Sequence, residues 1–247
     1  MDAYTEDFAE RGRSYDLAMQ RWPQVRAAEF TQVIAAANLR TGMSVADVPA
    51  GGGYLAHFLP PGIRYLPHEP CLSFNLGHAE AAAQSAPRVL PLPYQSQDVD
   101  RVISLAGVHH YVDKQPFHKE VHRVLQPQGL YVLSDVAEGS KVAAFLDNFV
   151  GQHNGTGHEG HYLGDNLAAE LYTAGFTIKS DFRERFIWKA TSVEQLAEFC
   201  LNLFGLKQLS VPEMEVALSQ YLGLVNLADG VGLKWELRTV VSQPGAT

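Results

Sequence analysis

The feature that most constrains the fold is an apolar run that ends in an acid and then turns through three consecutive glycines. Residues 45–54 read Val-Ala-Asp-Val-Pro-Ala-Gly-Gly-Gly-Tyr, and a helix-compatible stretch continues to Leu59. Glycine lets the backbone turn sharply and lets a ligand approach the main chain. The unpaired amide groups of a helix start attract negative or electron-rich groups. The pattern predicts a strand, a tight loop and a helix N-terminus that together bind a cofactor.

Apolar runs alternate with amphipathic stretches along the rest of the 247 residues. We expect strands at 43–48, 63–67, 89–90, 99–105, 129–135, 176–186 and 233–241. We expect helices at 15–38, 54–59, 77–84, 114–125, 166–174, 193–204 and 211–222, and a glycine-rich loop at 151–164. This order predicts an α/β fold with a Rossmann-like, seven-stranded, mostly parallel sheet, helices on both faces and a helical insertion before the last strand. Ligands bind beyond the carboxyl ends of the strands of such sheets.

The length and the order of elements predict one domain over residues 1–247. Residues 1–40 are expected to form an N-terminal helical cap. Residues 187–232 are expected to form the helical insertion and to cover the substrate side of the sheet.

Charge and composition narrow the range of partners. A net charge of −8 argues against a nucleic-acid partner. The first segment contains four arginines that alternate with acids, and we interpret them as part of a surface of mixed charge: Arg11, Arg13, Arg21 and Arg26. Two distant cysteines fit a reducing compartment. The acidic first residues are unlike a secretory leader, and no apolar run has the length of a membrane span. We expect a cytoplasmic protein that acts on a small molecule, without a membrane partner.

Four motifs in a fixed order resemble the class I S-adenosylmethionine-dependent methyltransferases, in particular the type 11-like members. Residues 47–53 are similar to the family loop Asp-x-Gly-x-Gly-x-Gly, with Pro49 in place of the first glycine. Glu69 matches the family's second acidic position. Three later stretches also resemble family motifs. Residues 92–102 are similar to Leu-Pro-Phe…Phe-Asp-x-Val, and residues 104–110 resemble the family segment that follows strand four. Residues 120–129 are similar to Glu-x-x-Arg-Val-Leu-x-Pro-Gly-Gly. The resemblance spans residues 43–136 and implies S-adenosylmethionine as the methyl donor.

The resemblance also implies which residues bind the donor. Glu69 is expected to accept hydrogen bonds from the ribose hydroxyls, and the backbone around Gly51, Leu105 and Ala106 is expected to hold the methionine ammonium. The family often has an Asp for the adenine amine where this chain has Arg88, so backbone groups near 89–90 are expected to bind adenine. The expected cofactor-binding residues are Asp47, Pro49, Gly51, Gly53, Glu69, Val89, Leu90, Leu105 and Ala106.

The acceptor side is expected at the loops that follow strands four to six. Methyl transfer from a sulfonium needs mainly in-line positioning and exclusion of water. His109 and His158 are the candidates for base or acceptor orientation, and the expected pocket residues are His110, His161, Tyr162 and Trp188. Each also has a purely structural interpretation as a packing residue. No metal motif of known spacing is present in the histidine-rich loop 153–162, so we expect no metal site.

Two other functions stay open at this point. One is a methyltransferase-like protein that binds S-adenosylmethionine or S-adenosylhomocysteine without catalysis. The other is a nicotinamide-dependent oxidoreductase, whose Gly-x-Gly-x-x-Gly fingerprint tolerates Ala56 at its third position. That second reading gives no role to residues 92–129.

Overall fold

A computed structural model describes residues 3–74, 88–155 and 157–245. Its strands are β1 (Ser44–Asp47), β2 (Arg64–Pro67), β3 (Val99–Leu105), β4 (Leu125–Asp135), β5 (Phe176–Ala190), β6 (Leu224–Leu227) and β7 (Gly230–Pro244). Its α-helices are α1 (Ala3–Arg21), α2 (Ala27–Ala37), α3 (Gln115–Val124), α4 (Lys141–Phe145), α5 (Gly151–His153), α6 (Leu167–Thr173), α7 (Val193–Leu203) and α8 (Val211–Ala217). Short 3₁₀ or π segments are η1 (Tyr54–Phe58), η2 (Leu72–Phe74), η4 (Val108–His110), η5 (Leu146–Val150) and η6 (Leu218–Leu222).

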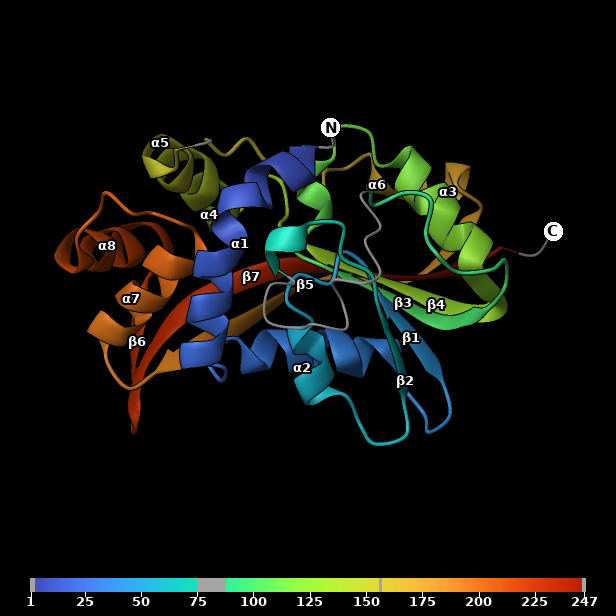
Figure 1. Cartoon of the computed structure of the whole chain (residues 1–247), viewed down its shortest axis with the longest axis horizontal. Coiled ribbons are helices and arrows are strands. Elements are labelled where there is room, and N and C mark those ends of the chain that lie inside the picture. Colours follow the sequence, from blue (N-terminus) through green and yellow to red (C-terminus); the bar gives the residue numbers. More distant parts are fainter. Residues whose placement is uncertain (1–2, 75–87, 156, 246–247) are drawn as a thin grey trace.

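The strands form one sheet in the order β2-β1-β3-β4-β7-β5, and β6 pairs with β7 (Figure 1). β1 pairs in parallel with β2 and β3, and β3 pairs in parallel with β4. β7 runs antiparallel to β4, β5 and β6. Within the described residues the sheet is therefore mostly parallel, with β7 as the reversed strand, and this confirms the expected Rossmann-like fold. The carboxyl ends of β1, β3 and β4 lie at the same edge of the sheet.

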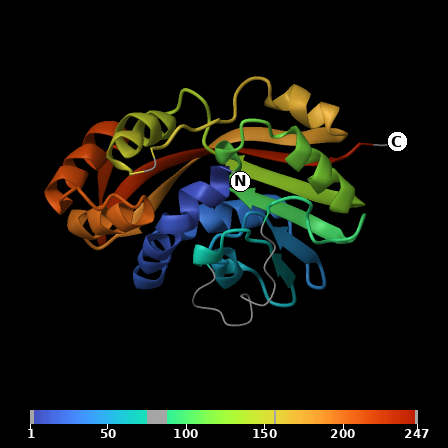
Figure 2. The ribbon, with the colours of Figure 1, turned by 45° about the horizontal axis from the view of Figure 1, so that its top comes forward.

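Helices cover both faces of the sheet (Figure 2). Neighbouring strand residues belong to different apolar clusters, as period-two geometry requires. Val45, Ile103 and Val132 contribute to the cluster that contains the α2 and α7 side chains, whereas their neighbours Val102 and Leu133 contribute to the cluster of α3 and α6. The burial of both faces explains why these strands are continuous apolar runs.

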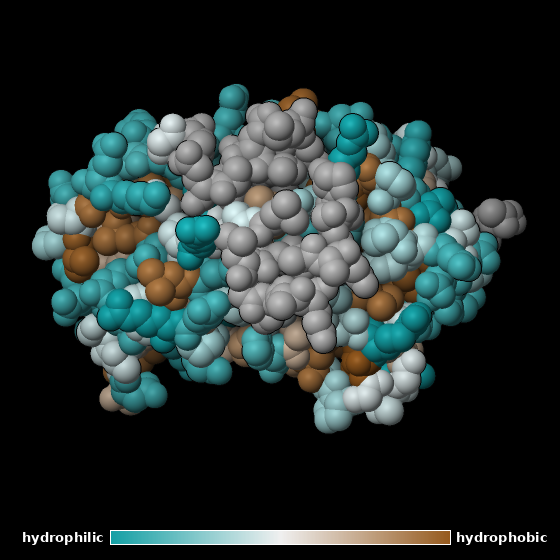
Figure 3. Space-filling model, viewed as in Figure 1, coloured by the Kyte–Doolittle hydropathy of each residue, from teal (hydrophilic) through white to brown (hydrophobic). Residues whose placement is uncertain are grey.

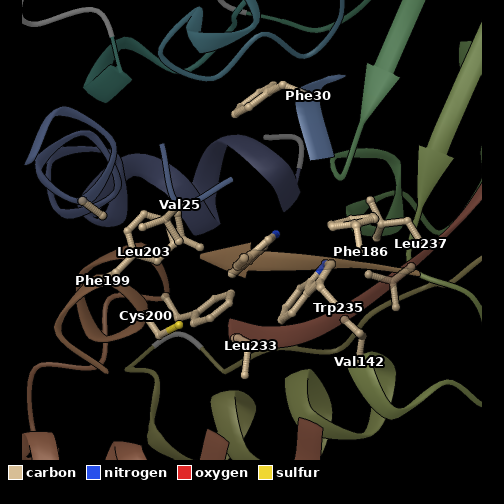
Figure 4. Close-up of a cluster of buried hydrophobic side chains, with 14 of the residues drawn as sticks. Val25, Phe30, Val142, Phe186, Phe199, Cys200, Leu203, Leu233, Trp235 and Leu237 are labelled. Atoms are coloured by element: carbon tan, nitrogen blue, oxygen red, sulfur yellow. The ribbon is translucent and has the colours of Figure 1, made fainter. Parts of the chain in front are cut away.

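The N-terminal helix and the insertion meet each other beside the sheet. Helix α1 packs along α7 (Figure 1), and Figure 4 shows Phe199, Cys200 and Leu203 of α7 facing the side chains of Leu233 and Trp235 on β7. These buried side chains fix α7 against the sheet. On the face shown in Figure 3, hydrophilic residues predominate outside the grey atoms, and hydrophobic residues lie in separate patches. None of the helices in the described ranges has the length and apolarity needed to cross a membrane.

Several predicted elements differ from the structure. The expected third strand at 89–90 is wrong, because these residues form a bend and pair with no strand of the described chain, and β6 supplies the seventh strand instead. The expected helix 15–38 is interrupted by a turn that contains Pro23, which lacks an amide hydrogen. The expected loop 151–164 begins with α5, and the expected helix 77–84 lies outside the described residues.

Candidate active site

The glycine loop is packed tightly on one side and open on the other. Gly51 has a φ of 55°, in the left-handed region that favours glycine. A Cβ atom at Gly51 would meet only the Tyr15 ring, 3.9 Å away, whereas a Cβ at Gly52 would lie 2.3 Å from the Tyr54 ring. The backbone at Gly51 therefore faces open space, as a position for a ligand requires.

Pro49 replaces the first glycine of the family loop, and a glycine from a neighbouring loop leaves room for its ring. Pro49 packs against Gly107, where a Cβ would lie 2.5 Å from Cγ of Pro49. Gly107 follows β3, on the neighbouring strand of the sheet. The loop after β1 thus tolerates the pyrrolidine ring because the loop after β3 has no side chain at this point.

A first cavity of about 50 Å³ lies between this loop and the N-terminal helices. Five of the nine expected cofactor residues line it: Asp47, Pro49, Gly51, Leu105 and Ala106. Its other walls come from α1, α2, η1, η2 and the turn before α2, through Tyr15, Phe30, Tyr54, Phe74 and Arg26. The structure does not place Gly53, Glu69, Val89 or Leu90 on the walls of this cavity. The cavity therefore corresponds to the expected position of the methionine end of the donor.

Asp47 is a buried acid at the carboxyl end of β1. One of its oxygens accepts a hydrogen bond of 2.7 Å from the hydroxyl of Tyr65. Burial raises the pKa of Asp47 to about 7, and the Tyr65 bond offsets only part of this effect. A cationic ligand in the cavity would stabilise the charged form, so this carboxyl group suits an ammonium partner.

Glu69 links the end of β2 to the glycine loop. Its Oε2 accepts from the amide of Gly51 at 2.7 Å, and its Oε1 accepts from the amide of Cys71 at 2.7 Å. The side chain is half-buried. An ionised carboxylate accepts hydrogen bonds from hydroxyl groups, so the Glu69 side chain has the chemistry that ribose hydroxyls require. The described residues thus fit the methionine and ribose parts of S-adenosylmethionine.

The expected adenine contacts lie partly at the edge of what the structure describes. Nε2 of His68 lies 2.9 Å from the carbonyl oxygen of Val89, which connects the end of β2 to this segment. Val89 is buried and Arg88 is exposed. Because residues 75–87 lie outside the described ranges, the contact of adenine with Val89 and Leu90 stays a prediction.

A second cavity of about 90 Å³ adjoins the first. The two share four wall residues: Tyr15, Arg26, Leu105 and Ala106. The second cavity is lined by three histidines and two tryptophans, which are His109, His110, His158, Trp188 and Trp235. Arg11 and several apolar side chains complete its walls. The structure thus brings together four of the six expected acceptor-side residues.

His161 and Tyr162 lie elsewhere than expected. They line an open groove of about 580 Å³ that also contains Asp147. The amide of His161 donates to the carbonyl oxygen of His109 at 2.8 Å, and the hydroxyl of Tyr162 donates to Asp147 at 2.5 Å. His161 thus contacts the His109 backbone, and the Tyr162 ring lies 6.0 Å from the His109 ring, but neither residue is on the cavity walls.

His109 is held by a buried carboxylate. Its Nδ1 lies 2.7 Å from Oδ1 of Asp135, which also accepts from the amides of Val108 and Val136 at 2.9 and 2.7 Å. Burial alone would raise the pKa of Asp135, but His109 and the amide bonds lower it below its usual value. The carboxylate is therefore ionised and accepts the hydrogen bond from Nδ1 of His109.

His110 and His158 are neutral at pH 7. Burial lowers the pKa of His110 well below its usual value, and the nearby His109 and His158 lower it further. Burial, His109 and Arg11 lower the pKa of His158 to about 4. The second cavity therefore combines neutral imidazoles with the buried guanidinium groups of Arg11 and Arg26.

One network of the site was not predicted from the sequence. Arg26 donates to both oxygens of Glu29, at 2.8 and 2.6 Å, and to the hydroxyl of Tyr15 at 2.6 Å. Nε1 of Trp188 donates to Glu29 at 2.9 Å. The interpretation of Arg26 and Arg11 as surface residues is wrong, because both are buried. The spacing of Arg26 and Glu29 by three residues in an apolar helix is the sequence signal that could have indicated a buried pair.

Comparison with known proteins agrees with this geometry. The family model described as a methyltransferase domain matches residues 74–133. An uncharacterised methyltransferase from Mycolicibacterium vanbaalenii is 30% identical over 151 residues, which cover 58% of this chain and 55% of the relative. The chain spans about half the length of the curated relatives it matches.

Solved structures share the fold at low sequence identity. The methyltransferase in a complex with the Trm112 activator of Haloferax volcanii has a TM-score of 0.60 at 17% identity, covering 100% of this chain and 99% of that one. The [4+2]-cyclase SpnF has a TM-score of 0.54 at 16% identity, covering 89% of this chain and 82% of that one. This chain is therefore similar to methyltransferases in its matched domain and in its curated relatives, and it shares the fold of solved methyltransferase structures.

Proposed function

We propose that this chain catalyses S-adenosylmethionine-dependent methyl transfer to a small-molecule acceptor by in-line displacement. The observation that carries the proposal is the pair of adjoining cavities with four shared wall residues. The first cavity is lined by the glycine loop and by the Asp47 carboxyl group, which suits the ammonium group at the methionine end of the donor. The other has neutral imidazoles and apolar walls. A donor and an acceptor bound there would lie side by side, as a displacement reaction needs.

The roles of the residues follow from their positions. Asp47 and the backbone at Gly51 hold the methionine end, and Glu69 holds the ribose. The bound donor supplies an already activated methyl group. His109 and His158 face the acceptor and set the orientation and protonation of its reacting atom, and Trp188 provides an apolar wall. The buried Asp135 keeps His109 in one tautomer.

The acceptor cavity supports a small molecule over a nucleic acid. Its walls are largely apolar and its volume is about 90 Å³, and the chain has a net charge of −8. The two cysteines, Cys71 and Cys200, are buried and form no disulfide with each other, which supports our proposal of a reducing, cytoplasmic location. The shared fold of SpnF means that fold alone does not establish methyl transfer.

Calorimetry with S-adenosylhomocysteine tests the donor site. We expect binding by the wild-type protein and at least about tenfold weaker binding by Glu69→Ala, because charge-assisted hydrogen bonds contribute about 1.5–3 kcal/mol each. The matched control is Glu215→Ala on α8, away from both cavities. Unchanged affinity of Glu69→Ala would show that the ribose role is wrong.

The same titrations separate the two alternative functions. Binding of NADH without binding of S-adenosylhomocysteine would favour the nicotinamide oxidoreductase. Binding of S-adenosylhomocysteine without turnover in a screen of hydroxyl, thiol and amine acceptors would favour the non-catalytic binding protein. Product detected as a mass increase of one methyl group on an acceptor would support the transferase.

A further inference from the structure

Two distant segments bring three histidines to one wall of the second cavity. His109 and His110 lie on η4 after β3, and His158 lies in the segment after α5. One ring nitrogen from each lies within 4.8 Å of the others. The ring centroids of His109 are 4.2 Å from His110 and 5.5 Å from His158. Ligands of a tetrahedral zinc ion with Zn–N bonds of about 2.1 Å are roughly 3.4 Å apart, so small side-chain rotations would complete such a site.

Two of the three histidines, His109 and His158, have a carboxylate next to Nδ1. Asp135 contacts Nδ1 of His109 at 2.7 Å, and Asp147 lies 3.4 Å from Nδ1 of His158. Because a carboxylate contacts Nδ1 in both rings, Nε2 is the ring nitrogen that would bind an ion. A carboxylate that fixes the tautomer and orientation of a histidine from behind is the arrangement found around metal-binding histidines in proteins.

The charge around the cluster suits a cation. Asp135 and Asp147 contribute two negative charges, and Arg11 on the same cavity contributes one positive charge. The second arginine of the cavity, Arg26, is paired with Glu29. Asp135 is fully buried, so its charge is poorly screened by solvent.

We propose that His109, His110 and His158 form a binding site for a divalent transition-metal ion, with Zn²⁺ as the best match to three imidazole ligands. Three histidines leave a tetrahedral ion with one open position, as in catalytic zinc sites. That position faces the second cavity. Provided that the proposed methyl transfer is correct, the acceptor is then a molecule with a metal-binding heteroatom, such as a hydroxyl or a thiol.

Metal binding is tested on the full chain without cofactor or acceptor. The protein is stripped with a chelator, given Zn²⁺, desalted and analysed for metal by mass spectrometry. In parallel, Co²⁺ is titrated and the visible ligand-field absorption is recorded. We expect one ion per chain and the intense absorption of four-coordinate cobalt. Zinc content no higher than that of a histidine-free reference protein, or only the weak absorption of octahedral aqueous cobalt, would overturn the proposal.

Variants assign the ligands. His158→Gln and His110→Gln should each weaken Co²⁺ binding by more than about 100-fold, and Asp135→Asn by about 10–100-fold. His153→Gln is the matched control, because its Nδ1 lies 2.8 Å from the carbonyl oxygen of Phe149, outside the cluster. It should bind as wild type does. Equal affinities for His158→Gln and His153→Gln would refute the ligand assignment.

A separate readout distinguishes this proposal from the proposed function. Binding of S-adenosylhomocysteine is measured on the metal-free protein and on each variant, since Glu69 and Asp47 hold the donor in a different cavity. If the metal proposal is wrong, donor binding persists without a cobalt signal. If the donor proposal is wrong, the cobalt signal persists without donor binding. A variant that fails to fold loses its circular dichroism, and the wild-type cobalt spectrum then decides.

Discussion

Replacing Asp47 by Asn is expected to change how the stability of the protein depends on pH. Burial raises the pKa of Asp47 to about 7, whereas an Asp in the unfolded chain titrates near 3.9. Between about pH 4 and pH 7 the folded protein therefore binds one proton more than the unfolded chain, and the free energy of unfolding falls as pH rises. About three pH units at about 1.4 kcal/mol each correspond to about 4 kcal/mol. Asn carries no charge and avoids this loss.

Urea unfolding at intervals between pH 4 and pH 8 measures the effect. We expect the stability of Asp47→Asn relative to wild type to increase across this range by up to about 4 kcal/mol. Asp229→Asn, which replaces an exposed acid, is the control, and its profile should run parallel to that of wild type. Parallel profiles for Asp47→Asn and wild type would refute the assignment of the raised pKa.

Cofactor binding should also depend on the charge of Asp47, but in the opposite direction to stability: the wild-type protein should bind more tightly as the pH increases. If the Asp47 carboxylate holds the ammonium group of the donor, binding stabilises its charged form and releases a proton. As the pH increases toward 7, the affinity of the wild-type protein for S-adenosylhomocysteine should then increase by up to tenfold per pH unit. Asp47→Asn should bind weakly, and its affinity should not change with pH in this way. Calorimetry in two buffers of different ionisation enthalpy counts the protons. A wild-type affinity independent of pH would contradict the role of Asp47.

Further predictions concern the buried ion pair and the glycine loop. Glu29→Ala leaves the buried Arg26 without its carboxylate and should lower the free energy of unfolding by about 3–5 kcal/mol in urea titrations, whereas Arg185→Ala breaks an exposed pair of the same 2.6 Å length and should leave the midpoint unchanged. A loss below about 1 kcal/mol for Glu29→Ala would contradict the first expectation. Gly51→Ala and Gly139→Ala both place alanine at a positive φ, 55° and 69°, and each should lose about 1–2 kcal/mol. In calorimetry only Gly51→Ala should also weaken S-adenosylhomocysteine binding, since its methyl group faces the cavity; equal affinities would argue against that placement.

The sequence predicted the parts of the fold that depend on local patterns. The apolar runs at β1, β3 and β4 are continuous because both faces of the parallel sheet are buried, and period-based analysis detects such runs. β6 was not predicted, because Leu224–Leu227 is short and pairs only with the first residues of β7, directly after the insertion. Residues 89–90 have the composition of a strand but have no strand partner in the described chain.

The candidate site was predictable where its residues follow strands directly. Asp47, Leu105 and His109 lie at or just after carboxyl ends, so their proximity follows from the parallel order of the strands. The approach of His158 to His109 could not be read from spacing, because it depends on the path of the chain after α5. The burial of Arg26 depends on its pairing with a carboxylate, and charge patterns along a sequence do not show pairing in space.

The common wall of the two cavities has a thermodynamic consequence. Tyr15, Arg26, Leu105 and Ala106 contact both spaces, so a ligand that shifts these side chains on one side changes the shape of the other. Any factor by which the donor changes the affinity for the acceptor must equal the factor by which the acceptor changes the affinity for the donor. Measuring that single factor with S-adenosylhomocysteine present and absent would identify acceptors by their coupling to the donor, before any turnover is observed.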